Sequence, residues 1–267
     1  MPRWQCLFAS VVLVVTIALP STLVLAPLPP ASGTQIVSAT PFAGIRGNAT
    51  SYNWAGYVAT GNPGQITWVY GKWRAPPVYC NSTTSYVATW LGIDGYNSST
   101  VEQIGTTAQC SGGVASYYAW WELYPASSVQ LITKITVHPH DIFEASVTYS
   151  NSTHEFTLRL RDITTRITFV KTASEPGTTE SSAEWILEAP SGDNGTASGI
   201  YPLAHFNREL FYRCLLTIAG RTSRLQLSSP IISVNMVNYP SGTRTLATTG
   251  PILGDGESFH VTWDYGY

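Results

Sequence analysis

A succession of short, β-rich segments separated by glycine- and proline-containing turns limits the fold more than any other feature of this chain. Turn sequences such as Gly61-Asn62-Pro63-Gly64 and Gly254-Asp255-Gly256 separate the segments. Short strands at this spacing predict an all-β fold, either a sandwich or a barrel. One run, 206–216, also fits a helix turn by its apolar spacing. The predicted strands are 54–58, 66–73, 85–93, 129–137, 142–149, 156–161, 167–170, 184–187, 225–227, 231–237 and 259–265.

The first 49 residues do not follow this pattern. Arg3 precedes an apolar run at 7–19, and Val24-Leu25-Ala26 offers a cleavage site, so residues 1–26 are predicted to be a signal peptide of a secreted, extracellular protein. The run is too short for a comfortable membrane span. Residues 27–49, rich in Pro, Gly, Ala and Ser, are either a short pro-segment or a disordered linker. Residues 50–267 contain no further linker and are predicted to form one domain.

Charged residues make up only 11% of the chain, and the formal net charge is −2. We therefore expect no nucleic-acid surface and no basic patch that would bind a membrane after signal removal. A surface rich in Ser, Thr, Asn and Tyr would stay soluble in acid, where carboxylates are neutral. We expect a monomer. Five Asn-X-Ser/Thr glycosylation signals agree with export, at Asn48, Asn81, Asn97, Asn151 and Asn194.

Three cysteines remain after the predicted signal peptide. In an oxidising compartment one pair is expected, and a Cys80–Cys110 bridge would close a loop around the strand that carries Gln103, worth on the order of 3 kcal/mol. Cys214, in an apolar run, is then most simply a buried free thiol. No Cys/His spacing is typical of a metal site, so we expect neither a metal nor a cofactor.

Two segments place polar side chains on apolar strands. The stretch 89–105 alternates apolar residues, turns at Asp94-Gly95 and then delivers Gln103. The stretch AEWILE puts Glu184 and Glu188 on one face of a strand and Trp185 on the other. Two carboxylates on the same face of an apolar strand are hard to explain by packing. Asp94 is predicted to serve the turn itself or to support a site.

Tryptophan and tyrosine side chains are the third element of the predicted site. Within AWWELYP, the residues Trp120, Trp121 and Tyr124 are of the kind that line a substrate cleft, with Glu122 among them. Neighbouring strand residues face opposite ways, so one of the two tryptophans is expected in the core. For Trp54 and Trp90, in SYNWAG and TWLGIDG, a cleft floor and the core remain open alternatives.

The motifs SYNWAG, TWLGIDG, EQIGT, AWWELYP and AEWILE occur in the order and approximate spacing of the glutamic peptidases, or eqolisins. From Ser51 onward the chain resembles this family of secreted acid endopeptidases, which implies an all-β fold, an antiparallel β-sandwich of two packed sheets. The resemblance places the catalytic glutamine on Gln103 and the catalytic glutamate on Glu188, with Glu184 as a strand neighbour. The chain departs from the family's pattern at Tyr118, where relatives have an acidic residue, and at 189–192, where relatives have an acidic run. Subsite preference is therefore expected to differ.

The resemblance implies hydrolysis of polypeptide substrates by a Gln/Glu dyad. Glu188 would activate the attacking water and later protonate the leaving amine. Gln103 would orient that water and stabilise the tetrahedral intermediate, a role typically worth about 3 kcal/mol of barrier. A carbohydrate-binding or carbohydrate-cleaving sandwich is the alternative, because aromatic platforms and paired carboxylates also act on sugars. A non-catalytic adhesin on the same scaffold is a third possibility.

Overall fold

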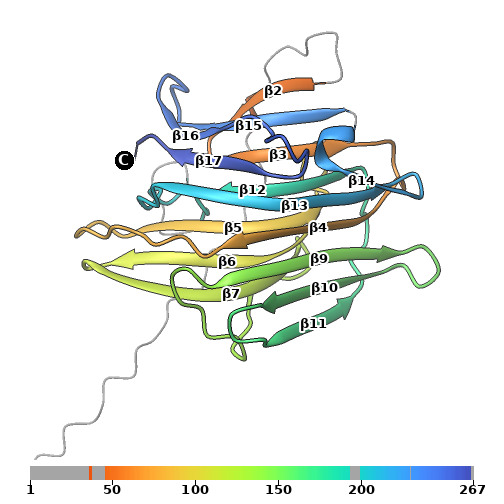
Figure 1. The fold of residues 1–267 in the computed structure, drawn as a ribbon, viewed down its shortest axis with the longest axis horizontal. Coiled ribbons are helices and arrows are strands. Elements are labelled where there is room, and N and C mark those ends of the chain that lie inside the picture. The colour runs from red at the N-terminus through yellow and green to blue at the C-terminus, as the bar shows by residue number, and fades with distance from the viewer. Residues whose placement is uncertain (1–35, 38–45, 193–198, 229, 266–267) are drawn as a thin grey trace, which may run out of the picture.

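The computed structural model describes residues 36–37, 46–192, 199–228 and 230–265 (Figure 1). The predicted signal peptide, most of 27–49 and Asn194 lie outside the described residues. Within them, no helix has the length and apolar character that a membrane span requires. The strands are β1 (Ile36–Val37), β2 (Arg46–Ser51), β3 (Trp54–Thr60), β4 (Ile66–Arg74), β5 (Ser85–Ile93), β6 (Val101–Ser111), β7 (Val114–Tyr124), β8 (Gln130–Leu131), β9 (Ile142–Ser150), β10 (Glu155–Asp162), β11 (Thr168–Ala173), β12 (Ser182–Glu188), β13 (Arg208–Ile218), β14 (Arg221–Arg224), β15 (Ile231–Val237), β16 (Thr245–Thr249) and β17 (Phe259–Trp263).

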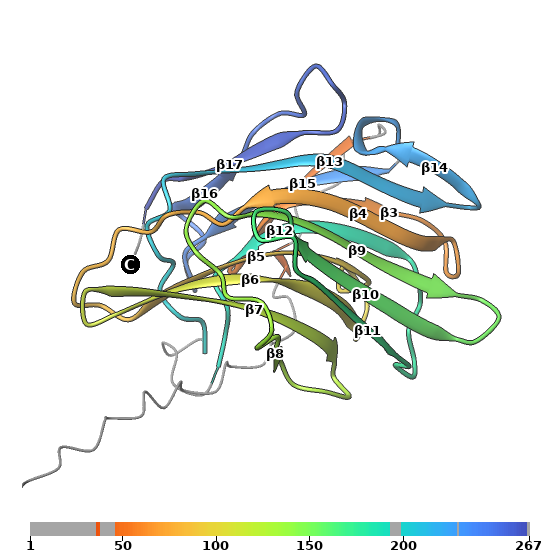
Figure 2. The same cartoon turned by 60° about the horizontal axis from the view of Figure 1, so that its bottom comes forward.

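The strands form two packed layers, as the sequence predicted (Figures 1 and 2). The first sheet runs β8-β7-β6-β5-β12-β3-β15-β16-β17, and β1 pairs with β2 at its side. Its pairs are antiparallel except that β2 lies parallel to β15. The second sheet runs β14-β13-β4-β9-β10-β11 and is antiparallel throughout. This is the predicted antiparallel β-sandwich.

Strand β13 belongs to both layers. Its first half, from Arg208 to Phe211, pairs with β17 of the first sheet. Its second half, from Tyr212 to Ile218, pairs with β4 of the second sheet. The run 206–216 that left helix and strand open is therefore a strand. Buried residues alternate along it in step with the two sheets, including Cys214 as a free thiol, which confirms that part of the cysteine prediction.

Two predicted strands are wrong. Of the segment 129–137 only Gln130–Leu131 is a strand, and the rest packs Ile132, Ile135 and Val137 into the core without a sheet partner along its length. The backbone N–H of Ile135 instead bonds the carbonyl of Ile132 in a turn. The segment Leu225–Leu227 forms the short 3-10 helix η1. Alternating apolar residues over so short a stretch do not distinguish a strand from a turn that buries one side.

Apolar side chains form two clusters. The larger fills the space between the two sheets and includes Trp185 and Leu187 of β12. The smaller covers the outer face of the first sheet and includes Trp54, Trp90 and Ile186. Because successive strand residues point to opposite faces, β12 contributes to both clusters. The outer face therefore receives the polar side chains that the sequence places beside Ile186.

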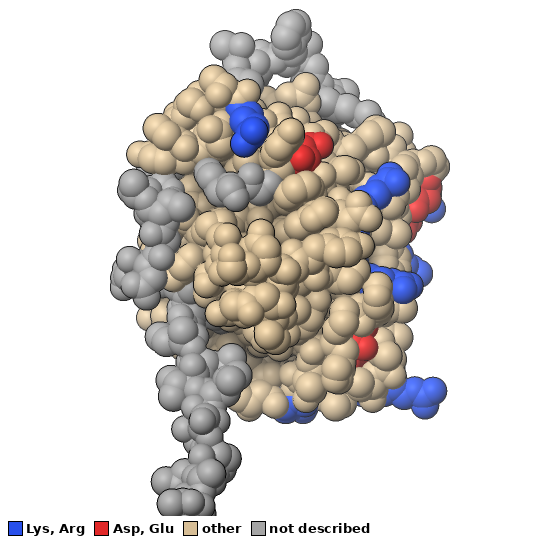
Figure 3. Space-filling model, turned by 90° about the vertical axis from the view of Figure 1, so that its left-hand side faces the viewer, with Lys and Arg blue, Asp and Glu red and all other residues tan. Residues whose placement is uncertain are grey.

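A disulfide joins Cys80 to Cys110, as predicted. It links the β4–β5 connection to the end of β6, at the left-hand end of the sandwich in Figure 1. Figure 3 shows this end of the molecule, where uncharged side chains cover most of the described surface. The low charge of the sequence is thus visible as a broad neutral face.

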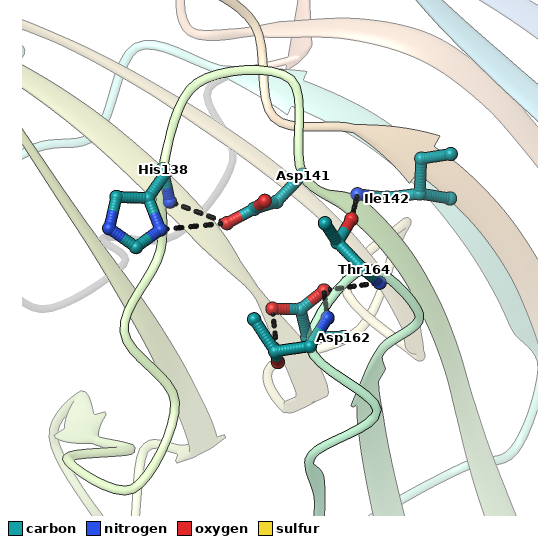
Figure 4. Close-up of polar contacts among 6 residues, drawn as sticks. His138, Asp141, Ile142, Asp162 and Thr164 are labelled. Atoms are coloured by element: carbon teal, nitrogen blue, oxygen red, sulfur yellow. Dashed lines mark hydrogen bonds and ion pairs between the residues drawn. The ribbon is translucent and has the colours of Figure 1, made fainter.

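Two aspartates accept hydrogen bonds that fix the turns beside β9 and β10 (Figure 4). Asp141 accepts the backbone N–H of His138 at 2.7 Å, which closes the turn before β9. Asp162 accepts the N–H of Thr164 at 2.8 Å after β10, and the Thr164 hydroxyl accepts the N–H of Ile142 at 2.9 Å. These bonds join the two turns at the edge of the second sheet, away from the candidate site.

Candidate active site

Strand β12 carries the centre of the site on the outer face of the first sheet. It lies between β3 and β5, so both of its edges are hydrogen-bonded. Glu184, Ile186 and Glu188 share the outer face, and Trp185 and Leu187 face the core between the sheets. The alternation predicted from AEWILE is confirmed. Glu188 is 2% exposed and Glu184 is fully buried, so both carboxyl groups lie out of bulk water.

Hydrogen-bond donors surround Glu188. The indole N–H of Trp90 donates to its Oε2 at 2.8 Å, and the Asn53 side-chain amide donates to its Oε1 at 3.0 Å. Burial raises the pKa of Glu188 to about 7, and donors from Trp90, Trp54 and Asn53 offset part of that rise. A buried carboxyl stabilised by N–H donors can change its protonation state near neutrality. That is the behaviour required of a general base that later acts as an acid.

Asn53 is a site residue that the sequence argument did not single out. Its Oδ1 accepts the Ser51 hydroxyl at 3.0 Å, which directs the Asn53 Nδ2 toward Glu188. The carbonyl of Asn53 also accepts the N–H of Ala189, so the backbone here is tied to the end of β12. The sequence signal for Asn53 was its place in the motif SYNWAG, directly before Trp54. In the structure, Trp54 pairs with Glu188 across β3 and β12.

Gln103 lies on the same outer face and is fully buried. Its Nε2 donates to Oε2 of Glu122 at 2.7 Å, directly across the β6–β7 pair. The Oε1 of Gln103 is buried and accepts no hydrogen bond from a described residue. One amide N–H is therefore held by Glu122, while the second N–H and the carbonyl oxygen stay available to a bound water or substrate.

The register sets the separation of the candidate catalytic pair. Glu188 pairs with Ala88, which pairs with Thr107, whereas Gln103 lies four residues further along β6. The two Cα positions are therefore about 10 Å apart across the strands and about 13 Å apart along them. No hydrogen bond joins their side chains. A row formed by Gly105, Trp90 and Ile186 lies between them.

Gly105 has no side chain on the outer face, and this lets β6 approach Trp90 closely. A Cβ at this position would come within 2.5 Å of the Thr89 carbonyl oxygen and 2.6 Å of the Trp90 Cβ. Only glycine therefore lets β6 lie beside Trp90 in this register. The ring of Trp90 also contacts Trp54 edge to face, with centroids 5.1 Å apart. Both tryptophans are buried in the smaller apolar cluster of the outer face.

Glu184 occupies a different environment at the other end of β12. Glu184 pairs with Gly92 of β5, and Gly92 pairs with Gln103 of β6, so Glu184 and Gln103 lie in register across the sheet. Burial raises its pKa well above the ordinary value, and the charge of Asp94 raises it further. The nearby Ser182 hydroxyl and Tyr96 N–H offset this only in part. The surroundings of Glu184 therefore favour its neutral form.

Asp94 supports the turn after β5 and lies outside the row of catalytic candidates. Its carboxylate accepts the N–H groups of Thr179, Glu180 and Ser181 at 2.7, 2.9 and 2.9 Å. The turn is thus bonded to the segment that leads into β12. Its negative charge also raises the pKa of the buried Glu102, of which desolvation is the larger cause.

The remaining aromatic candidates divide between the two faces. Trp120 and Tyr124 of β7 lie on the outer face with the site, and the Trp120 indole donates to the Thr107 hydroxyl at 2.9 Å. Trp121 faces the other way and packs against the main core, with the Lys171 ammonium 5.2 Å from its ring. The two tryptophans face opposite ways, as the strand alternation predicted, and Trp120 is the more deeply buried of the two. Among the described residues, no group of three or more His, Cys, Asp or Glu side chains is placed to hold a metal ion.

Comparison with known proteins identifies the family. The family model described as the Peptidase A4 family matches residues 52–259, most of the chain and all of the site. The chain belongs to the Peptidase A4 family. It is thus a peptidase of the glutamic, or eqolisin, type, and the resemblance seen in the motifs is confirmed. No curated protein matches the chain.

Solved structures show the same fold. Scytalido-glutamic peptidase, determined with a peptide-based transition-state analogue, is 23% identical, with a TM-score of 0.67 over 80% of this chain and 98% of that one. SCP-B, an eqolisin in complex with the tripeptide Ala-Ile-His, is 21% identical, with a TM-score of 0.63 over 80% and 98%. Aspergilloglutamic peptidase from Aspergillus niger is 24% identical, with a TM-score of 0.56 over 67% and 99%. At these identities the likeness supports the β-sandwich fold.

Proposed function

We propose that the protein is a secreted acid endopeptidase in which Glu188 activates water and Gln103 stabilises the oxyanion. The observation that carries the proposal is the buried Glu188 carboxyl, with a pKa of about 7 and two N–H donors, on the same outer face as the buried amide of Gln103. The chain's membership of a peptidase family supplies the reaction class, and the chemistry of these two side chains supplies the roles.

In the proposed reaction Glu188 takes a proton from water as the water attacks the scissile carbonyl. The same carboxyl then returns that proton to the leaving amine, so it ends the cycle ionised as it began. Donors from Trp90 and Asn53 hold the carboxylate in one orientation and stabilise its charge. No residue forms a covalent bond to the substrate in this scheme.

Gln103 is proposed to act on the carbonyl oxygen of the substrate. The amide N–H that Glu122 does not hold would donate to the developing oxyanion, and the Gln103 Oε1 would accept a hydrogen from the attacking water. Since Trp90 and Gly105 lie between the two residues, the scissile peptide group must sit above that row to meet both. An amide does not titrate, so this donor works at any acid pH.

An acid working range requires that the pKa of Glu188 fall when water reaches its carboxyl group. Desolvation is the largest cause of its raised pKa, and the reaction itself brings water to this carboxyl. Hydration moves the pKa back toward the ordinary range of a glutamic acid. The base form of Glu188 is then present in mild acid. Export is supported by the signal-like segment 1–26 and the Cys80–Cys110 disulfide.

The test is hydrolysis of a denatured protein and of polysaccharides by the same preparation, between about pH 2 and pH 7. We expect new amino termini from the protein substrate with a maximum below pH 7, and no new reducing sugar ends. The Glu188→Gln protein, prepared in parallel, controls for contaminating peptidases. Sugar release without peptide cleavage would refute the proposal.

A further inference from the structure

A cavity lies away from the candidate active site, where β13 passes from one sheet to the other. It has a volume of about 410 Å³ and is lined by residues at the end of β4, along β13 and before β17. Three arginines, Arg74, Arg208 and Arg213, are among its lining residues. None of the outer-face residues assigned to catalysis borders it. The cavity is therefore a separate feature of the fold.

Arg213 reaches the cavity from a β-bulge in β13. The register of β13 against β4 shifts between Tyr212 and Leu215, so one extra residue bulges from the strand. Arg213 lies in that bulge with a φ of 55°, a left-handed conformation that is uncommon for a residue other than glycine. Bulges redirect side chains, and such conformations occur often at binding sites. The bulge thus adds a third guanidinium to the two already at the cavity.

The three guanidinium groups have no carboxylate partner. None of the ion pairs found among the described residues includes Arg74, Arg208 or Arg213. The buried Glu209 accepts the backbone N–H of Arg74 at 3.2 Å, and burial raises its pKa well above the ordinary value, so Glu209 is neutral in acid. Asp255 is held negative by hydrogen bonds from Ser258 and Glu257. In acid the cavity lining therefore carries three positive groups and one negative group.

We propose that this cavity binds an organic oxyanion, a phosphate, sulfate or carboxylate group carried on an apolar body. Arginine presents a planar fork of donors that matches two oxygens of such a group. Pro76, Pro77 and Leu210 supply an apolar wall beside the arginines. A cavity of this volume is large enough for a small organic ligand. This proposal does not depend on the catalytic roles assigned above.

The test is isothermal titration calorimetry at pH 4 with phenyl phosphate, inorganic phosphate and phenol as probes. We expect one saturable site per chain for phenyl phosphate, binding at least tenfold weaker for inorganic phosphate, and no heat from phenol. Arg213→Gln and Arg208→Gln should each weaken phenyl phosphate binding at least tenfold. Arg221→Gln, which changes an exposed arginine of β14 outside the cavity, is the matched control and should bind as the unaltered protein does.

Thermal unfolding of each variant shows whether it is folded before its titration is interpreted. Absence of a saturable phenyl phosphate site, or equal affinity in Arg213→Gln, would overturn the proposal. Equal affinity for inorganic phosphate and phenyl phosphate would overturn the apolar part of it. A crystal soaked with phenyl phosphate should show the phosphoryl oxygens facing Arg213, and a ligand bound elsewhere would contradict the assignment.

Discussion

Two glutamates of β12, four residues apart on one face, have opposite surroundings. Glu188 receives N–H donors from Trp90 and Asn53, and its pKa is about 7. Glu184 has the negative Asp94 nearby, and its pKa is raised well above the ordinary value. Burial is the largest cause of the shift at both residues. Because both carboxyl groups are buried, the difference comes from their neighbours, which are N–H donors at Glu188 and the negative Asp94 at Glu184.

The largest expected effect comes from Glu188→Gln, which is nearly isosteric and removes the proton acceptor. We expect kcat/KM on a denatured protein to fall about 10²- to 10⁴-fold, the usual contribution of general acid–base catalysis. Glu184→Gln is the matched variant on the same strand, and we expect activity within a few-fold of the unaltered protein. The opposite order of losses would show that Glu184, which shares a row with Gln103, is the base.

Gln103→Ala should lower kcat by roughly 100-fold with little change in the unfolding midpoint, since one oxyanion donor is worth about 3 kcal/mol. Gln109→Ala is the control on the same strand, because the Gln109 side chain bonds the Tyr86 hydroxyl and not the site. Gln103→Glu sharpens the comparison, since it donates only when protonated and its remaining activity should shift to lower pH. Full activity of Gln103→Glu at pH 6 would exclude the oxyanion role.

A smaller effect is expected when a donor to Glu188 is removed. Asn53→Ala takes away one N–H that favours the charged form, so the pKa of Glu188 should rise further. The ascending limb of kcat/KM against pH should then move to higher pH than in the unaltered protein, where we expect it below about pH 7. Ser51→Ala, which frees the Asn53 amide, should move the limb in the same direction by less. An unmoved limb in both variants would show that another group titrates.

The smallest effect is the contribution of Glu184 to the pH dependence of folding stability. Because its pKa in the folded protein lies above the ordinary value of 4.5, the folded state holds a proton that the unfolded chain loses. Stability from this group is complete below about pH 4.5 and is lost as pH rises, by up to about 1.4 kcal/mol per pH unit. We expect the urea midpoint to fall between pH 4 and pH 7, and to fall less in Glu184→Gln. Glu155→Gln, at the start of β10, should leave the slope unchanged.

Strand periodicity was sufficient to place the site residues on the correct faces. It put both glutamates of AEWILE outward and separated Trp120 from Trp121, because side-chain direction depends only on counting along one strand. The order of the strands is a different kind of information. Asn53 reaches Glu188 across 135 positions of sequence, and Asp94 bonds a segment 85 positions away. Such contacts follow from which strands become neighbours, and no local pattern specifies that.

The two wrong strands have the same physical origin. In 129–137 the apolar residues recur often enough to suggest alternation, yet Ile132 and Ile135 are three apart and are buried through a turn. A short segment can bury such side chains without backbone pairing when it packs over an existing core. The same ambiguity explains η1, where Leu225 is buried and Leu227 is 73% exposed. Burial is thus predictable from composition where hydrogen-bond partners are not.

The passage of β13 from one sheet to the other makes the sandwich a single cooperative unit. Arg208 to Phe211 pair with β17, and Tyr212 and Leu215 to Ile218 pair with β4, so neither layer can open without breaking bonds that also anchor the other. In amide hydrogen exchange, the N–H groups of β17 and β4 should therefore exchange through one common opening reaction with the same free energy. The arginine-lined cavity sits at this joint, so a ligand bound there would slow exchange in both layers at once.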